Sequence, residues 1–246
     1  TKQKEIMAVS IDTVYQKVLA LANKEQRGYI TPQEFNLFAD MAQKEIFDQY
    51  FYDLNQFKRV PGNDTEYADI VGLIEEKINV FRRSIGGYAN GMVLPYNNPN
   101  FPNFYQITNA YVSSLTQAGY SNIIEEISVS EAMASQNSPL TKAHHSRPVY
   151  YLEQSKIYFF PSVVAEGYSY NIKYIDRPVK PSWSYMVVNG KALYNSTAST
   201  DFELHLSEES ELTYKILKFA GISMKKQDIT QAGQGLESTQ VSQEKQ

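Results

Sequence analysis

The chain contains no cysteine. Disulfide bonds, thiol nucleophiles and cysteine-ligated zinc are therefore excluded. Long apolar runs are also missing, since no stretch approaches the roughly 18 residues that a membrane-spanning helix needs. The first six residues lack the apolar core of a secretory signal. We therefore expect a protein that is made and assembled in a reducing cytoplasm and does not enter a membrane.

An excess of positive charge is missing as well. The net charge is −4 and the isoelectric point is about 5.5, which argues against a protein whose main task is to neutralise phosphates. With 246 residues, 42% of them hydrophobic, the chain is long enough to bury a core as one elaborated domain or two small ones.

Tyrosine is the residue in unusual supply, with 19 copies against a single tryptophan. Its ring is apolar and its tip is polar, so it suits surfaces that are wet before assembly and buried afterwards. It also favours strands. Both interpretations, a subunit interface and a tyrosine-rich sheet, remain open at this point.

Helical periodicity dominates the N-terminal third. A first helix is predicted from Ser10 to about Glu25. Thr31, Pro32 and Glu34 form a helix start with a capping box, and a long apolar stripe follows to Phe57. Thr65 opens a third helix that carries Phe81 and is expected to end at Gly86-Gly87. Three such helices are expected to pack as a bundle.

Short β-rich runs punctuated by Pro, Gly, Asn and Ser follow between residues 88 and 205. A hairpin is expected around Glu153-Gln154-Ser155. The predicted strands are 104–113, 123–129, 148–152, 156–160 and 168–175.

A helix returns at Ser207, with Glu208 and Glu209 in its first turn, and is expected to stop at Gly221. The predicted class is α+β: an N-terminal helical bundle is completed by a C-terminal helix, with an inserted β-rich region and an extended C-terminal tail. The expected parts are 1–87 (helical), 88–205 (β-rich insertion), 206–225 (C-terminal helix packing on the N-terminal helices) and 226–246 (Gln/Ser-rich tail).

Chemistry-bearing motifs are scarce. The segment 23–34 has the length of an EF-hand loop, but its fifth position is Arg27, which cannot bind calcium. His144, His145 and His205 lack the spacing of a metal site. No Walker loop, nucleophile elbow or dinucleotide fingerprint occurs. The prediction is no catalytic residue, no cofactor and no metal, although a hydrolase assembled from distant carboxylates remains an alternative.

Four residues are candidates for partner binding: Trp183, Ile229, Leu236 and Val241. Trp183 follows a basic and aromatic stretch, 173–180, that is suited either to brushing DNA or to packing as a Pro-rich loop. The other three are the sizeable apolar residues of a tail too polar to order itself. An adjacent subunit is therefore the expected binding site for the tail.

The chain resembles a family of virion structural proteins of tailed bacteriophages, the head-to-tail connector or adaptor subunits of marine, short-tailed and crAss-like phages. The resemblance rests on helix caps, strand cores and turns that run through most of the chain. The stretches that carry it are residues 10–15, 28–36, 147–151, 156–161, 201–204, 207–209 and 220–222.

This resemblance implies a non-enzymatic ring protein. It would form a closed ring of twelve identical subunits below the portal protein, contact tail proteins, and let genomic DNA pass without sequence-specific binding. The implied location is the neck of the virion, away from any membrane. The alternative within the same class is another virion component, such as a tail ring, a fibre adaptor or a minor capsid protein.

Overall fold

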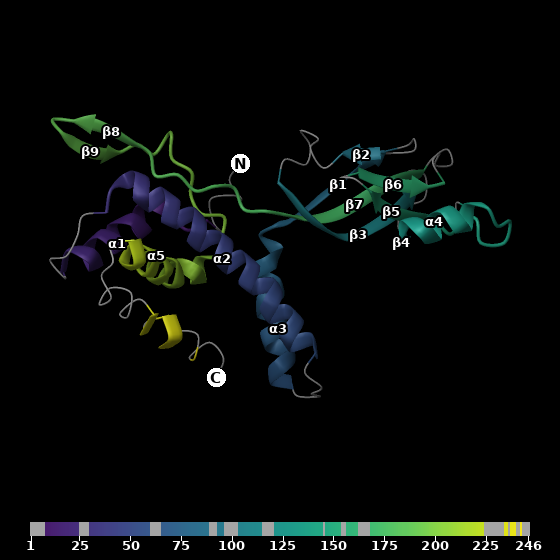
Figure 1. Ribbon diagram of the computed structural model, residues 1–246, viewed down its shortest axis with the longest axis horizontal. Helices are drawn as coiled ribbons and strands as arrows, with labels where there is room; N and C mark the ends of the chain where they lie inside the picture. The colour runs from purple at the N-terminus through teal and green to yellow at the C-terminus, as the bar shows by residue number, and fades with distance from the viewer. Residues whose placement is uncertain are drawn as a thin grey trace. The chain divides into compact units, whose positions relative to one another are not determined.

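The computed structural model describes residues 8–24, 30–59, 65–88, 93–95, 103–114, 121–144, 146–153, 156–161, 168–223, 234–235, 237–239 and 242. The chain divides into two compact units (Figure 1). The helical unit comprises Thr1–Val80 and Pro178–Gln246, and the sheet unit comprises Phe81–Arg177. The predicted α+β class is confirmed.

Four α-helices make up the described core of the helical unit: α1 (Ile11–Lys24), α2 (Pro32–Arg59), α3 (Thr65–Asn79) and α5 (Glu209–Ser223). A short 3-10 helix, η1 (Leu206–Glu208), leads into α5. The predicted docking of the C-terminal helix is confirmed, because α5 contacts both α1 and α2 (Figure 1). The apolar residues that meet there are fully buried: Val14, Val18, Phe35, Ala39, Ile46, Leu212 and Ile216.

The predicted capping box at the start of α2 is also present. The backbone N–H of Thr31 donates to Glu34 Oε2 at 3.0 Å, and the backbone N–H of Glu34 donates to Thr31 Oγ1 at 3.3 Å. The hydroxyl of Thr31 also donates to Glu34, and this bond lowers the pKa of the Glu34 carboxyl. Two backbone donors of the first turn are thereby satisfied.

Two predicted helix ends were wrong. Helix α3 ends at Asn79, and Gly86 lies in strand β1 (Arg82–Tyr88), directly opposite Asn171. A Cβ atom at Gly86 would lie 1.8 Å from Asn171 Oδ1, so glycine here makes room for a neighbouring side chain and does not stop a helix. Helix α5 continues through Gly221 to Ser223, because a glycine inside a packed helix costs only about 1 kcal/mol.

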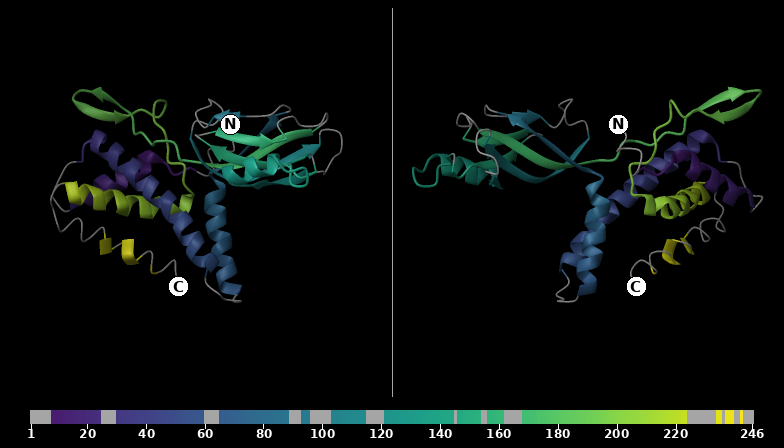
Figure 2. Two further views of the ribbon diagram at one scale, coloured as in Figure 1. Left: turned by 45° about the vertical axis from the view of Figure 1, so that its right-hand side comes forward. Right: turned by 180° about the vertical axis from the view of Figure 1, so that it is seen from behind.

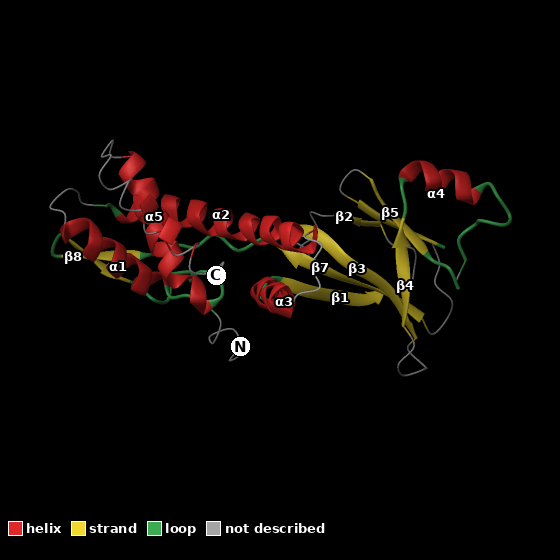
Figure 3. Cartoon of the chain, turned by 90° about the horizontal axis from the view of Figure 1, so that it is seen from below, coloured by secondary structure: helices red, strands yellow, loops and turns green. Residues whose placement is uncertain are grey.

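The sheet unit contains a seven-stranded sheet in the order β1-β7-β3-β4-β5-β6-β2 (Figure 3). All neighbouring strands are antiparallel except β4 and β5. The predicted hairpin is confirmed by the pairing of Glu153 with Lys156. The remaining strands are β2 (Val93–Pro95), β3 (Phe104–Ser114), β4 (Ser121–Glu126), β5 (Val149–Glu153), β6 (Lys156–Phe160) and β7 (Tyr168–Asp176).

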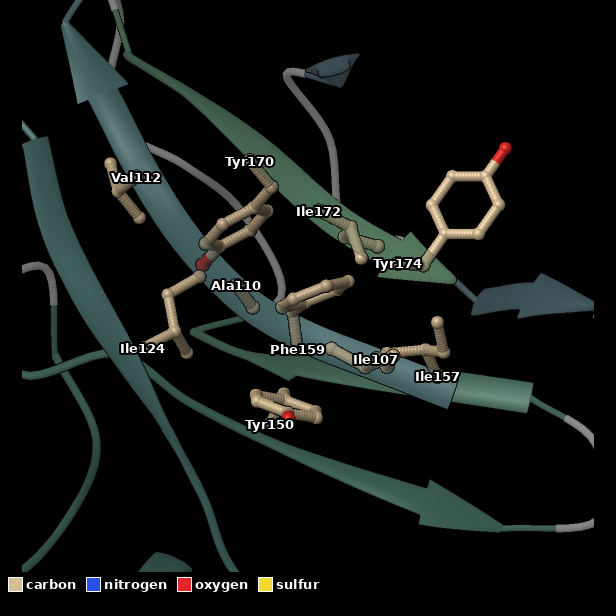
Figure 4. Packing of buried hydrophobic residues seen from close by; sticks show 10 residues of the cluster. All are labelled: Ile107, Ala110, Val112, Ile124, Tyr150, Ile157, Phe159, Tyr170, Ile172 and Tyr174. Carbon is tan, nitrogen blue, oxygen red and sulfur yellow. The ribbon is translucent and has the colours of Figure 1, made fainter. Parts of the chain in front are cut away.

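One apolar cluster fills the inner face of this sheet (Figure 4). Tyr170 and Phe159 stack with ring centroids 4.6 Å apart. Burial raises the pKa of Tyr170 to about 12, and its hydroxyl donates to the carbonyl of Pro161 at 2.7 Å. The cluster comprises Ile107, Ala110, Val112, Ile124, Tyr150, Ile157, Phe159, Tyr170, Ile172 and Tyr174. Several of the tyrosines are therefore sheet residues, as one of the two interpretations predicted.

A short helix inside this unit was not predicted. Helix α4 (Val129–Gln136) is capped by Ser128, whose side chain accepts from the backbone of Glu131 while the Glu131 carboxylate accepts from the backbone of Ser128. The strand predicted over 123–129 therefore ends at Glu126. The S-x-x-E pattern at 128–131 is the signal for this helix start.

The segment 178–205 belongs to the helical unit, although it was predicted to be part of the β-rich insertion. It follows β7 and contacts both α1 and α2: Trp183 donates to Asp12 of α1, and the carbonyl of Val179 accepts from Gln43 of α2. It also contains two further strands, β8 (Tyr185–Val188) and β9 (Lys191–Tyr194), which form a separate two-stranded sheet.

Candidate functional site

Strands β8 and β9 form a β-hairpin that we call the hairpin arm (Tyr185–Tyr194). Its register runs from Tyr185 opposite Tyr194 to Val188 opposite Lys191. The two turn residues, Asn189 and Gly190, have φ values of 50° and 75°, as a type I′ turn requires. The turn lies away from the helices of its unit (Figures 1 and 2).

The hairpin arm exposes apolar side chains along both strands and on both faces. Val187 is 67% exposed and Met186 is 54% exposed. Every residue of β8 is exposed to solvent, and Leu193, opposite Met186 on β9, is 50% exposed. An isolated two-stranded hairpin is marginal in water, and a contiguous exposed apolar surface marks an interaction site. The hairpin arm is therefore the candidate functional site.

Trp183 holds the base of the hairpin arm on the helices. Its indole ring lies between aromatic rings, with centroids 4.3 Å from Tyr15 of α1 and 5.8 Å from both Tyr185 and Tyr194 of the arm. Tyr15 in turn packs edge-on against Phe35 at 4.7 Å. The aromatic stack thus continues from the arm into the helical core.

Hydrogen bonds to α1 and α2 fix the same residue. The indole Nε1–H of Trp183 donates to Asp12 Oδ1 at 2.9 Å. The side-chain amide of Asn36 accepts from the backbone N–H of Trp183 at 2.7 Å and donates to its carbonyl at 3.1 Å. All three polar groups of a residue that is 3% exposed are therefore satisfied. The base of the arm is held by these hydrogen bonds while its strands are uncovered.

The predicted partner-binding residues are placed as follows. Trp183 packs within its own chain, which is the packing role weighed as the alternative. Ile229, Leu236 and Val241 lie outside the described residues. Partner contact by these four stays a prediction. The hairpin arm itself was not predicted, although Asn189-Gly190 between β-favouring residues is a strong hairpin signal.

A cluster of charged side chains connects the tail to α5. Lys215 is 1% exposed, and its ammonium lies 2.9 Å from Glu45, 3.5 Å from Glu211 and 2.8 Å from Glu237. Lys218 also pairs with Glu237, at 3.0 Å. Burial alone would lower the pKa of Lys215, but its hydrogen bonds to Glu237 and Glu45 raise it above the ordinary value. A described part of the tail therefore binds its own helix.

Cationic side chains of the sheet unit rest on neighbouring aromatic rings. The ammonium of Lys173 lies 5.6 Å from the ring centroid of Tyr111, and the guanidinium of Arg177 lies 5.5 Å from that of Tyr105. Both cations are exposed. Such pairs stabilise a sheet surface by about 0.5–1 kcal/mol each, so they need no nucleic acid to explain them.

Among the residues that the structure describes, the carboxyl groups with a shifted pKa are Glu34, Glu131 and Glu237, and each shift is downward. A backbone hydrogen bond from Ser128 lowers the pKa of Glu131. Burial alone would raise the pKa of Glu237, but hydrogen bonds from Lys215 and Lys218 lower it. A carboxylic acid that donates a proton in catalysis needs a raised pKa, so these groups fit structural roles.

The histidines that the structure describes make local contacts. His205 caps η1 by accepting from the backbone N–H of Ser207 at 3.3 Å, and His144 Nδ1 lies 2.7 Å from Ser146 Oγ. Within the described ranges, no three His, Asp or Glu side chains gather as a metal site would require.

Across those same ranges, no helix combines the length and the apolar character needed to cross a bilayer. No known family model matches the chain, and no significant relative is found among curated proteins.

Proposed function

We propose that this protein is a non-enzymatic structural subunit of a bacteriophage head-to-tail connector, acting in a closed ring of identical copies below the portal protein. In this role it stabilises the joint between head and tail, and it keeps a passage open for DNA. No chemical step is required of any side chain.

One observation supports the proposal most: the apolar strands of the hairpin arm are uncovered, while hydrogen bonds and ring contacts of Trp183 hold its base on the helices. Trp183 is fixed by Asp12 and Asn36, so the arm is presented in one place. Its strands nevertheless leave Met186 and Val187 more than half exposed. A protein that works alone gains nothing from such a surface and risks aggregation. A subunit gains an anchor that is buried on assembly.

The acidic balance of the chain is compatible with this role. A ring through which DNA slides without sequence-specific binding must not hold the phosphates tightly, because each neutralised phosphate adds to affinity. The net charge of −4 meets that requirement, and the exposed cations Lys173 and Arg177 are accounted for by the sheet surface.

The test is the place and copy number of the chain in its native particle. We expect purified virions to contain twelve copies, and electron microscopy with an antibody against this chain to label the neck. Labelling at the tail tip or the capsid would favour another virion component. Absence of the chain from particles would contradict both the connector hypothesis and the hypothesis of another virion component.

A further inference from the structure

Helices α2 and α3 of the helical unit pack against each other (Figure 1), and a cavity lies between them. We call it the helix cavity. Its volume is about 400 Å³, at the lower end of the range for small-molecule sites. Leu73 is 59% exposed, so part of the apolar wall faces water. The apolar residues that line the cavity are Ile46, Tyr50 and Phe57 of α2 and Ile70, Leu73 and Ile74 of α3.

Glu208, at the end of η1, adds a buried carboxylate to the lining. Its side chain is 1% exposed. The Oε1 atom lies 2.7 Å from the ammonium of Lys77 and accepts from the hydroxyl of Ser207 at 2.9 Å. No described residue donates to the other oxygen, Oε2, although that atom is buried. A buried acceptor without a donor is destabilising, so a ligand that donates to Oε2 would relieve that cost.

A rotation of this carboxylate can bring Oε2 to a ligand. The atom is closed to water in this conformation, whereas Glu208 itself lines the cavity. The last torsion of a glutamate side chain has a broad range of allowed angles. Oε2 can therefore turn toward the cavity without a change in the backbone.

The charges around the helix cavity favour a cation. Glu211 is partly offset by Lys215, which lies 3.5 Å away. Carboxylates nevertheless outnumber ammonium groups, and apolar walls strengthen the field of such charges. The described lining contains four carboxylates and one lysine, with no arginine: Asp53, Glu76, Glu208 and Glu211, with Lys77.

An organic amine meets these conditions better than a metal ion or a purely apolar molecule. Among the described residues, no three His, Asp or Glu side chains are placed to hold a metal, and a bare ion would leave Leu73 uncovered. A purely apolar ligand would cover Leu73 but would leave Glu208 Oε2 without a donor. An ammonium group on an alkyl or aryl body serves both, because it forms a charge-assisted hydrogen bond and fills the apolar space.

We propose that the helix cavity binds a small organic amine, with the ammonium group at Glu208 and the apolar body between α2 and α3. The cavity is formed by residues other than those of the hairpin arm. The inference goes beyond the proposed connector role and does not depend on it.

Three probes with the same apolar body test which group is recognised. Phenethylamine has both a positive charge and N–H donors. Its quaternary trimethyl derivative has the charge without a donor, and phenethyl alcohol has a donor without the charge. Calorimetry on the full chain should show saturable binding of phenethylamine and binding at least tenfold weaker for the other two. Absence of saturable amine binding, or equal binding of either analogue, overturns the inference.

A substitution in the cavity wall tests where the amine binds. Leu73→Arg places a positive charge at an exposed position, so the fold should survive while the amine is repelled. Met133→Arg is the matched control, because Met133 is 51% exposed on α4 of the sheet unit. We expect Leu73→Arg to weaken phenethylamine binding at least tenfold and the control to leave it unchanged. Equal affinities of the two variants would contradict binding in the helix cavity.

Glu208→Gln tests the carboxylate itself. Glutamine keeps the length of the side chain and one acceptor oxygen but removes the charge, so phenethylamine should bind at least tenfold more weakly. Unchanged affinity in a folded variant overturns the role assigned to Glu208. If this variant does not fold, Leu73→Arg decides the question. A wild-type chain that is found in the virion neck but binds no amine overturns this inference and leaves the connector proposal intact.

Discussion

Two hairpins of this chain have similar composition, but one is buried and the other is exposed to solvent. Strands β5 and β6 place Tyr150, Ile157 and Phe159 in the core of the seven-stranded sheet. Strands β8 and β9 also carry tyrosine and aliphatic residues, yet Met186 and Val187 face water. Local sequence is sufficient to make both hairpins. Only the first has enough of the chain around it to bury its apolar side chains, and those of the second are exposed to solvent.

The largest loss of stability is expected from a substitution at Phe159, in the buried hairpin. Phe159→Ala removes a ring that stacks on Tyr170 at 4.6 Å and should destabilise the sheet unit by about 3–5 kcal/mol. Hydrogen exchange of the β7 amides measures the loss. The matched change in the arm, Val187→Ala, should alter stability by less than about 0.5 kcal/mol. Equal effects at the two sites would remove the distinction between the hairpins.

A smaller effect is expected at the base of the arm. Asn36→Ala leaves the backbone N–H and carbonyl of buried Trp183 without their partners, which should cost about 1–3 kcal/mol. Trp183 is the single tryptophan, so the midpoint of its fluorescence transition in urea reports the loss directly. Gln56→Ala, at an exposed position of the same helix, is the control. An unchanged midpoint would mean that aromatic stacking alone holds the arm.

The smallest effect is expected at the turn of the arm. Gly190 has a φ of 75°, so Gly190→Ala should destabilise the hairpin by about 1 kcal/mol. Asn189→Gly should be tolerated, because glycine adopts the φ of 50° found at that position without strain. Faster amide exchange in β8 and β9 for the alanine variant alone is the expected outcome. Similar exchange in both variants would contradict the turn geometry.

Signals that depend on a few adjacent residues predicted the structure well. The capping box of Thr31 and Glu34 and the strand pair around Glu153 were read from short patterns and are present. The docking of the last helix on the N-terminal helices was also predicted and is present. Two more short patterns of this kind mark elements that were not predicted: Ser128 with Glu131 begins α4, and Asn189 with Gly190 forms the turn of the arm.

Features that depend on distant residues could not be predicted. Gly86 is a glycine because of Asn171, which follows it by 85 positions and meets it only across a sheet. Lys215 is buried because Glu45, 170 residues away in the sequence, and Glu237 both bind its ammonium. The exposure of the arm could not be predicted from the sequence either, because Tyr185 and Val187 are also typical of a buried strand.

The close approach of Gly86 to Asn171 limits how this protein can change over evolutionary time. Asn171 occupies the space that any larger residue at position 86 would need, and its Nδ2 donates to Ser113 Oγ at 2.6 Å. A descendant with alanine at position 86 would have to move or shorten the side chain at position 171, and that step would remove one of the two hydrogen bonds of Ser113 Oγ, which also bonds Ser169 Oγ at 3.1 Å. Gly86, Asn171 and Ser113 lie on three different strands and depend on one another. We therefore expect homologous chains to change these three positions together or to keep all three.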